Sequence, residues 1–222
     1  MMFAAGFGTR MKHLTENQPK PLINIAGKPL VDHALGLARR AGCAPIVANL
    51  HYKAEMLQAH LDPQGVLTIV ESPEILETGG GLRNAHHLLG SDVVVTMNTD
   101  AIWAGPNPVE MLLRAWQPDE MDALLVCVPT KNTIGHGGEG DFTLTETGRI
   151  DRGHGTVYGG IQIMKTHLLG DITAQKFSLN LVWDKMLAVR RLYGLSYPGR
   201  WCDVGHPGGI KLAEDMLERF DV

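Results

Sequence analysis

Two glycines and two basic side chains gather directly after the first apolar segment of this 222-residue chain. Gly6 and Gly8 follow the segment at residues 1–5, and Arg10 and Lys20 come next. Glycine lets a backbone approach a ligand with no Cβ in the way, and exposed N–H groups in such a loop bind phosphate oxygens. A guanidinium and an ammonium are well suited to phosphate. The segment therefore predicts a phosphate-binding loop, with an ordinary tight turn beside two solvated cations as the alternative.

Two aspartates far apart in the chain have the chemistry to hold a metal ion. Asp100 follows the apolar run at residues 92–97, and Asp203 lies in Trp-Cys-Asp-Val-Gly before the last amphipathic stretch. Ligands of open α/β sheets bind at the carboxyl ends of strands, and Mg²⁺ in nucleotide enzymes takes one or two carboxylates plus phosphate oxygens and water. The pair predicts a Mg²⁺ site, with capping as the alternative for each. Asp92 and Asp122 are expected to be solvated strand ends.

Further polar and glycine-rich positions indicate contacts with a base or a sugar. The three glycines at 79–81 stand at the start of a helix expected over residues 80–89. Because glycine weakens a helix start, they indicate close approach of a flat base or a sugar, or else a flexible loop. Glu71 is a candidate acceptor for the N3–H of uracil or thymine, or a solvated strand-end residue. Asn180, which begins a later helix, is a candidate sugar contact or a helix cap.

Together these segments closely resemble the sugar-1-phosphate nucleotidyltransferase family. The resemblance is carried by Ala-Ala-Gly-x-Gly-Thr-Arg-Met at 4–11, Pro-Lys-Pro-Leu at 19–22, Gly-Lys-Pro at 27–29, Asn-Thr-Asp at 98–100 and Trp-Cys-Asp-Val-Gly at 201–205. Glu-Thr-Gly-Gly-Gly at 77–81 is similar to the short members that include N-acetylmuramate-1-phosphate uridylyltransferases.

The resemblance implies a role for each matched position. Arg10 and Lys20 would be the catalytic residues that hold the phosphates, and Asp100 and Asp203 would hold Mg²⁺ as the cofactor. The nucleotide would be bound by Ala4, Ala5, Gly6, Gly8, Thr9, Thr78 and Gly79. The sugar substrate would be bound by Asn98, Gly159 and Asn180.

One family feature has no counterpart in this sequence. Longer members carry a Glu-Lys-Pro segment whose lysine grips the sugar phosphate, and Lys131-Asn132-Thr133 does not match it. Arg149 and Arg152 are alternative anchors, unless either is a surface charge. The glycine-rich residues 135–140 are expected to be a mobile loop.

The resemblance implies transfer of a nucleotidyl group. An oxygen of a sugar 1-phosphate, with one like N-acetylmuramate 1-phosphate favoured, would attack the α-phosphorus of a nucleoside triphosphate, with UTP favoured, and release pyrophosphate. The nucleophile is already an anion, so the protein needs no base, and Mg²⁺ and cations would offset the repulsion between phosphates. The alternatives are a noncatalytic nucleotide-sugar-binding regulatory protein of the same fold, or another acceptor such as mannose 1-phosphate or phosphocholine.

Short apolar runs that alternate with amphipathic stretches predict the fold class. Strands are expected at residues 1–5, 45–50, 66–70, 92–97, 122–128, 156–164 and 192–197, with a hairpin strand at 142–150. Helices are expected at residues 28–40, 53–61, 80–89, 107–116, 178–190 and 207–220. This order predicts a three-layer α/β/α, Rossmann-like nucleotidyltransferase fold with a mainly parallel mixed sheet. Residues 1–222 are expected to form one domain, with the nucleotide part in 1–130 and the sugar part and closing helix in 131–222.

Composition limits the partners of the chain. A net charge of -4 and a sequence pI of about 6.2 argue against a nucleic-acid-binding surface. No apolar run approaches the roughly 20 residues of a membrane span, and the start of the chain lacks the pattern of a signal peptide. Three cysteines without Cys-x-x-Cys spacing favour a reducing compartment. We expect a cytoplasmic monomer or homodimer with no nucleic-acid or membrane partner.

Overall fold

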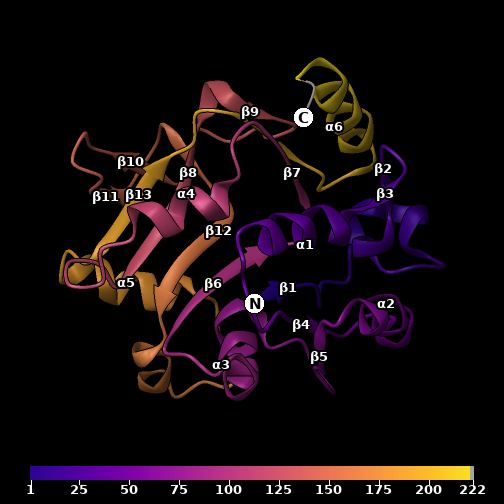
Figure 1. Cartoon of the computed structure of the whole chain (residues 1–222), viewed down its shortest axis with the longest axis horizontal. Helices are drawn as coiled ribbons and strands as arrows, with labels where there is room; N and C mark the ends of the chain where they lie inside the picture. Colours follow the sequence, from indigo (N-terminus) through magenta and orange to yellow (C-terminus); the bar gives the residue numbers. More distant parts are fainter. Residues whose placement is uncertain (221–222) are drawn as a thin grey trace.

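The centre of the molecule is a nine-stranded mixed sheet (Figure 1). The computed structural model describes residues 1–220, so residues 221 and 222 of the expected domain lie outside the described residues. The first half of the sheet is parallel and consists of β5 (Leu67–Val70), β4 (Val47–Leu50), β1 (Met2–Phe3) and β6 (Val93–Asn98). Parallel strands of this kind align their carboxyl ends at one edge, where α/β folds bind ligands.

A long strand, β12 (Thr156–Lys165), joins this half to the rest of the sheet. One edge of β12 pairs along its length with β8 (Ala123–Pro129), which in turn pairs in parallel with β13 (Leu192–Ser196). The other edge pairs with β6 through residues 161–165 of β12. At its first residue, Thr156, the same edge pairs with β10 (Phe142–Leu144). The hairpin of β10 and β11 (Ile150–Arg152) therefore stands beyond the carboxyl end of β6.

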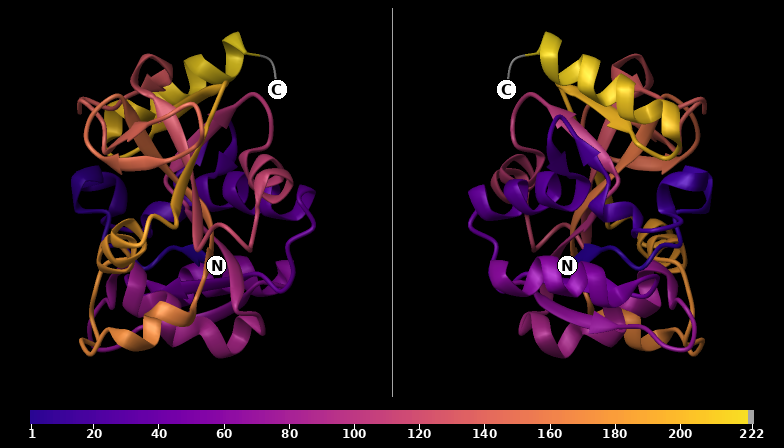
Figure 2. Two further views of the ribbon diagram at one scale, coloured as in Figure 1. Left: turned by 90° about the vertical axis from the view of Figure 1, so that its left-hand side faces the viewer. Right: turned by 90° about the vertical axis from the view of Figure 1, so that its right-hand side faces the viewer.

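Helices cover both faces of the sheet, as the two side views in Figure 2 show. One face packs a core cluster with α1 (Leu30–Arg40), α2 (Ala54–Leu61) and α4 (Pro108–Ala115). The other packs a second cluster with α3 (Glu77–Leu89) and α5 (Asn180–Ala188). The expected three-layer α/β fold class is confirmed. None of the helices among residues 1–220 is long and apolar enough to cross a membrane.

A small second sheet lies above the carboxyl ends of the main strands. It has three strands, β7 (Ala101–Ala104), β14 (Arg200–Asp203) and β9 (Thr133–Ile134), and α6 (Pro207–Arg219) packs on it. A two-stranded ribbon, β2 (Asn24–Ile25) and β3 (Lys28–Pro29), lies nearby. The sequence analysis did not predict these five strands.

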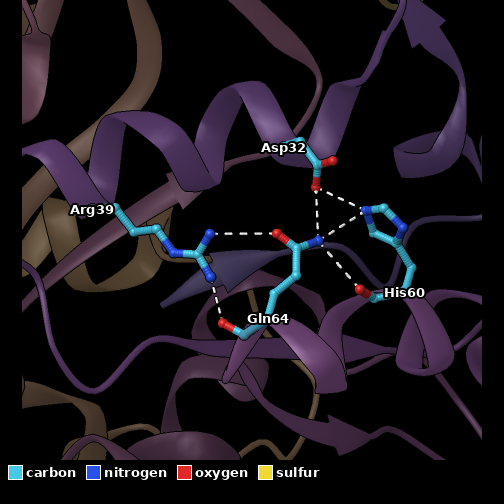
Figure 3. A network of polar contacts seen from close by, with 4 residues as sticks. All are labelled: Asp32, Arg39, His60 and Gln64. Atoms are coloured by element: carbon cyan, nitrogen blue, oxygen red, sulfur yellow. Dashed lines mark hydrogen bonds and ion pairs between the residues drawn. The ribbon is translucent and has the colours of Figure 1, made fainter.

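A polar network ties α1 to the end of α2 (Figure 3). The Asp32 carboxylate accepts hydrogen bonds from His60 at 2.8 Å and from Gln64 at 3.2 Å. Arg39 donates to the side-chain oxygen of Gln64 at 3.4 Å and also to its backbone carbonyl. The network fixes the helices that flank the parallel half of the sheet.

Candidate active site

The second sheet brings the two candidate metal ligands together. The β7–β14 ladder pairs Ala101 with Asp203, and the backbone N–H of Val204 donates to the carbonyl of Asp100 at 3.0 Å. Asp100 and Asp203 are therefore neighbours at the end of β6, although 102 positions separate them in the chain. Such an arrangement fits a metal site better than two independent helix or turn caps.

The electrostatics of Asp203 would favour a bound cation. Burial raises the pKa of this carboxyl above its ordinary value, and the carboxylate of Asp100 raises it further, while Lys20, Arg10 and His136 oppose the shift. A divalent cation would offset the repulsion between the two carboxylates. Among residues 1–220 no group of three or more His, Cys, Asp or Glu side chains could hold a metal. A cation here would therefore take its other ligands from phosphate and water.

Lys20 reaches this pair of carboxylates from the glycine-rich loop. Its Nζ lies 2.8 Å from Oδ2 of Asp100, and its side chain is only 11% exposed. Gly8 makes this placement possible, because its φ is 66° and a Cβ there would lie 2.9 Å from Cβ of Lys20. The missing side chain of Gly8 thus makes room for Lys20 rather than for a ligand.

Arg10 also lies near Asp203. A Cβ added to Gly205 would lie 2.9 Å from both Nη1 of Arg10 and Oδ2 of Asp203, so that glycine leaves space for both side chains. Arg10 itself is exposed. Its guanidinium can therefore bind an anion that approaches the aspartate pair from solvent.

A pocket with an empty volume of about 690 Å³ opens beside Asp100. The expected nucleotide and substrate contacts that line it are Ala4, Ala5, Gly6, Thr78 and Asn98, together with Lys20 and Asp100. A Cβ on Gly6 would meet nothing within 4 Å, so the backbone of this residue faces open space. Gly8, Thr9 and Gly79 do not line the pocket.

The glycines at 79–81 lie inside the first turns of α3, not before it, and their role differs from the expected one. A Cβ on Gly79 would collide with the Phe177 ring, one on Gly80 with the carbonyl of Gln175, and one on Gly81 with Oε1 of Glu71 at 2.6 Å. The N–H groups of Gly79 and Gly80 donate to the Phe177 carbonyl at 2.9 and 3.0 Å. These glycines allow a close approach of protein to protein at the start of α3.

Glu71 is buried at 1% exposure, so the expectation of a solvated strand-end residue is wrong. Its carboxylate accepts hydrogen bonds from Nδ2 of Asn49 at 2.7 Å and from the backbone N–H of Leu76 at 2.7 Å. The oxygen of Asn49 accepts from Ala4 N–H at 2.9 Å, which holds the end of β1 beside the pocket. The sequence analysis missed Asn49, because no motif marks it.

A second pocket adjoins the first and shares Thr78 and Asn98 with it. Its empty volume is about 610 Å³, and it is also lined by Asp141, Phe142, Arg152, Tyr158, Ser178, Leu179, Asn180 and Trp183. Asn180, the candidate sugar contact, lines this second pocket. Gly159 lines neither pocket, because it packs against Trp103 and accepts a hydrogen bond from Nε1 of Trp201 at 3.0 Å.

The structure separates the two candidate phosphate anchors. Arg149 stacks on Tyr193 at 4.6 Å and donates to the carbonyl of Arg190, away from both pockets. Arg152 lines the second pocket. The glycine-rich residues 135–140 also lie closer to the site than expected. Gly135, with φ of 75°, approaches the carbonyl of Asp203, and the ring of His136 lies 6.1 Å from that of Trp201.

Fold and site together are those of an enzyme that transfers nucleotidyl groups. A family model for MobA-like NTP transferase domains matches residues 1–169, and the chain belongs to that family. It is 36% identical over 98% of its length to an N-acetylmuramate alpha-1-phosphate uridylyltransferase of Caulobacter vibrioides, of which it covers 96%. An enzyme of the same name from Neisseria meningitidis is 30% identical, with 97% of this chain and 96% of that one covered.

A solved structure supports the fold alone. It is that of a Bacillus anthracis protein provisionally assigned as a glucose-1-phosphate thymidylyltransferase. The two share 14% sequence identity with a TM-score of 0.80, and the match covers 96% of this chain and 92% of that one. The predicted resemblance to sugar nucleotidyltransferases is therefore confirmed, and this chain is a nucleotidyltransferase.

Proposed function

We propose that this nucleotidyltransferase transfers a uridylyl group from UTP to N-acetylmuramate 1-phosphate and releases pyrophosphate. The two bacterial relatives of matching length carry this activity in their names. The observation that carries the proposal is the pair of adjoining pockets that share Thr78 and Asn98, with Asp100 in the lining of the first. Two adjoining pockets suit a reaction with two substrates.

We assign the first pocket to the nucleotide and the second to the sugar. In this arrangement the α-phosphate of UTP lies near Asp100, between the glycine-rich loop and the end of β6. The phosphate of the sugar enters from the second pocket and attacks the α-phosphorus in line, while the bond to the pyrophosphate breaks. Holding both substrates in one geometry supplies much of the rate enhancement.

Charge stabilisation supplies the rest. Asp100 and Asp203 would hold Mg²⁺, which offsets negative charge on the transferred phosphate when bound. Lys20, whose Nζ lies 2.8 Å from Asp100, would place a positive charge beside the transferred phosphate as well. Arg10, beside Asp203, would hold the leaving pyrophosphate with its forked donors. We place the reaction in the cytoplasm, in one catalytic domain, where Cys43, Cys127 and Cys202 remain free thiols.

The experiment that tests the proposal is a matrix of four nucleoside triphosphates against several sugar 1-phosphates, scored by pyrophosphate release. The expected maximum is UTP with N-acetylmuramate 1-phosphate in the presence of Mg²⁺. Release of pyrophosphate with mannose 1-phosphate or phosphocholine alone would reassign the acceptor. A complete absence of turnover, with binding of a nucleotide sugar by calorimetry, would favour the noncatalytic alternative.

A further inference from the structure

The second pocket has an aromatic wall with a single cation on it. Trp183 packs edge to face with Tyr158 at 4.8 Å and with Phe142 at 6.0 Å. The guanidinium of Arg152 lies over the rings of Phe142 at 5.0 Å and Trp183 at 5.7 Å. Among the residues that the structure describes, Arg152 is the only basic one that lines this pocket. An anionic group of a bound acceptor would therefore find its positive partner at Arg152.

Arg152 is held in place but keeps donors free. Its Nη2 donates to Oδ1 of Asp184 on α5 at 2.8 Å, and its side chain remains 41% exposed. A guanidinium has five N–H donors in a rigid fork, so one pairing leaves several of them for a ligand. The stacking on Phe142 and Trp183 restricts the remaining freedom of the side chain. The group is thus positioned in advance for a carboxylate.

The strand register places Arg152 away from the reacting phosphate. In the strand register Arg152 pairs with Phe142, and Phe142 pairs with Thr156 of β12. The end of β6 lies beside Gly160 of β12 instead. This displacement of four residues along β12 is roughly 13 Å, at about 3.3 Å per residue. The acceptor phosphate must lie at the end of β6, beside Asp100. Arg152 therefore faces the far side of the sugar ring, not its phosphate.

Resting on the proposed function, we infer that Arg152 binds a carboxylate carried by the sugar ring of the acceptor. Arg152 selects an acidic sugar 1-phosphate over a neutral one. N-acetylmuramate carries such a group, because it is N-acetylglucosamine with a lactyl ether, and the lactyl carboxylate lies across the ring from the 1-phosphate. Asp184 is a positioning residue that holds the guanidinium toward the pocket.

The test compares three acceptors with UTP: N-acetylmuramate 1-phosphate, its lactyl methyl ester, and N-acetylglucosamine 1-phosphate. Arg152→Gln removes the charge and keeps a polar side chain. The expected result is a loss of about 10- to 100-fold in kcat/KM for the free acid, mainly through KM. For the ester and the neutral sugar the change stays within about twofold. The matched control is Arg149→Gln, on the same hairpin but outside the pocket, which should leave all three values near wild type.

Each other outcome has a definite meaning. An equal loss with all three acceptors would contradict the inference, because Arg152 would then either bind the phosphate or stabilise the fold. Thermal unfolding of the variant separates these two cases. Equal use of the free acid and the neutral sugar by the wild type would also overturn it, while nucleotidyl transfer itself would stand. Failure of the wild type to release pyrophosphate with any sugar 1-phosphate would instead reject the proposed function.

Discussion

At the scale of single residues, the candidate site gathers four charged side chains that come from three distant segments of the chain. Lys20 contacts Asp100 directly, and Arg10 and Asp203 flank Gly205. The four residues could be predicted because their motifs are unusual in spacing. The burial of Glu71 and its hydrogen bond from Asn49 could not be predicted, because Asn49 lies on a strand whose pairing is set by the whole sheet.

Arg10→Ala tests the charge on the leaving group. We expect kcat to fall about 100-fold with a smaller change in KM, because the lost hydrogen bonds strengthen as charge develops on pyrophosphate. The measurement is steady-state pyrophosphate release with UTP and the sugar 1-phosphate. Arg40→Ala on the exposed end of α1 is the control. An unchanged kcat for the Arg10 variant would remove this residue from the reaction.

Asp203→Asn tests the electrostatic strain at the aspartate pair. The folded-state pKa of Asp203 is raised, first by burial and then by Asp100, so its stabilising contribution is present at low pH and is lost as pH rises through that pKa. At pH 7 its ionised form therefore opposes folding, and the neutral amide should increase the free energy of unfolding by about 0.5 kcal/mol after solvent screening.

The measurement for this variant is urea unfolding at pH 7 and at pH 3.5 without divalent cations. The gain should disappear at the lower pH, where the wild-type carboxyl is protonated. A loss of stability at pH 7 would instead indicate a stabilising structural role for the Asp203 carboxylate, such as capping.

At the scale of elements, the long strands and helices follow the hydrophobic pattern, and their ends shift by a few residues. The helix expected at 28–40 is α1 at Leu30–Arg40, and the strand expected at 156–164 is β12 at Thr156–Lys165. The short strands β7, β9 and β14 escaped prediction because two to four residues carry too little periodicity and their partners are remote in sequence. These are the strands that join the two aspartates.

The start of α3 offers a test at this scale. Gly79→Ala should lower the free energy of unfolding by about 1–3 kcal/mol, because the added methyl group meets the Phe177 ring and carbonyl. Gly6→Ala should change stability by less than about 0.5 kcal/mol, since its Cβ meets nothing within 4 Å. The same variant should reduce turnover, because the methyl group enters the nucleotide pocket. Chemical denaturation of both variants is the measurement, and equal stabilities would refute the packing role of Gly79.

At the scale of the whole molecule, a buried charge cluster joins three strands at the end of the sheet opposite the site. Oδ1 of Asp122, next to β8, forms ion pairs with Nζ of Lys165 at 3.1 Å and with Nε of Arg191 at 2.9 Å. The expectation that Asp122 is a solvated strand end is wrong, because its side chain is 9% exposed. The sequence could not show this, since Lys165 at the end of β12 and Arg191 just before β13 come much later in the chain.

Asp122→Asn should lower the free energy of unfolding by about 2 kcal/mol at pH 7, because it leaves two cations without their partner. Burial raises the pKa of Asp122, but hydrogen bonds from Arg191 and Lys165 outweigh it and the net shift is downward. The contribution is therefore present above the unfolded pKa of about 3.9 and is lost as pH falls through the folded pKa. In unfolding curves at pH 7 and pH 3, the difference between variant and wild type should shrink at the lower pH.

The control for this prediction is Asp92→Asn, whose side chain is 93% exposed and should matter by less than about 0.5 kcal/mol. A pH-independent difference between Asp122→Asn and wild type would assign the effect to packing rather than to charge.

The most direct measurement of the central claim is phosphorus NMR of UTP and N-acetylmuramate 1-phosphate mixed with the wild-type protein and with Asp100→Asn. With Mg²⁺, the wild type should convert the UTP signals into those of a sugar-linked diphosphate and free pyrophosphate. Chelation of the metal, or the single change of a carboxylate oxygen to an amide, should slow this conversion by at least about 100-fold while the thermal unfolding curve stays cooperative. Conversion by Asp100→Asn at the wild-type rate would contradict the account.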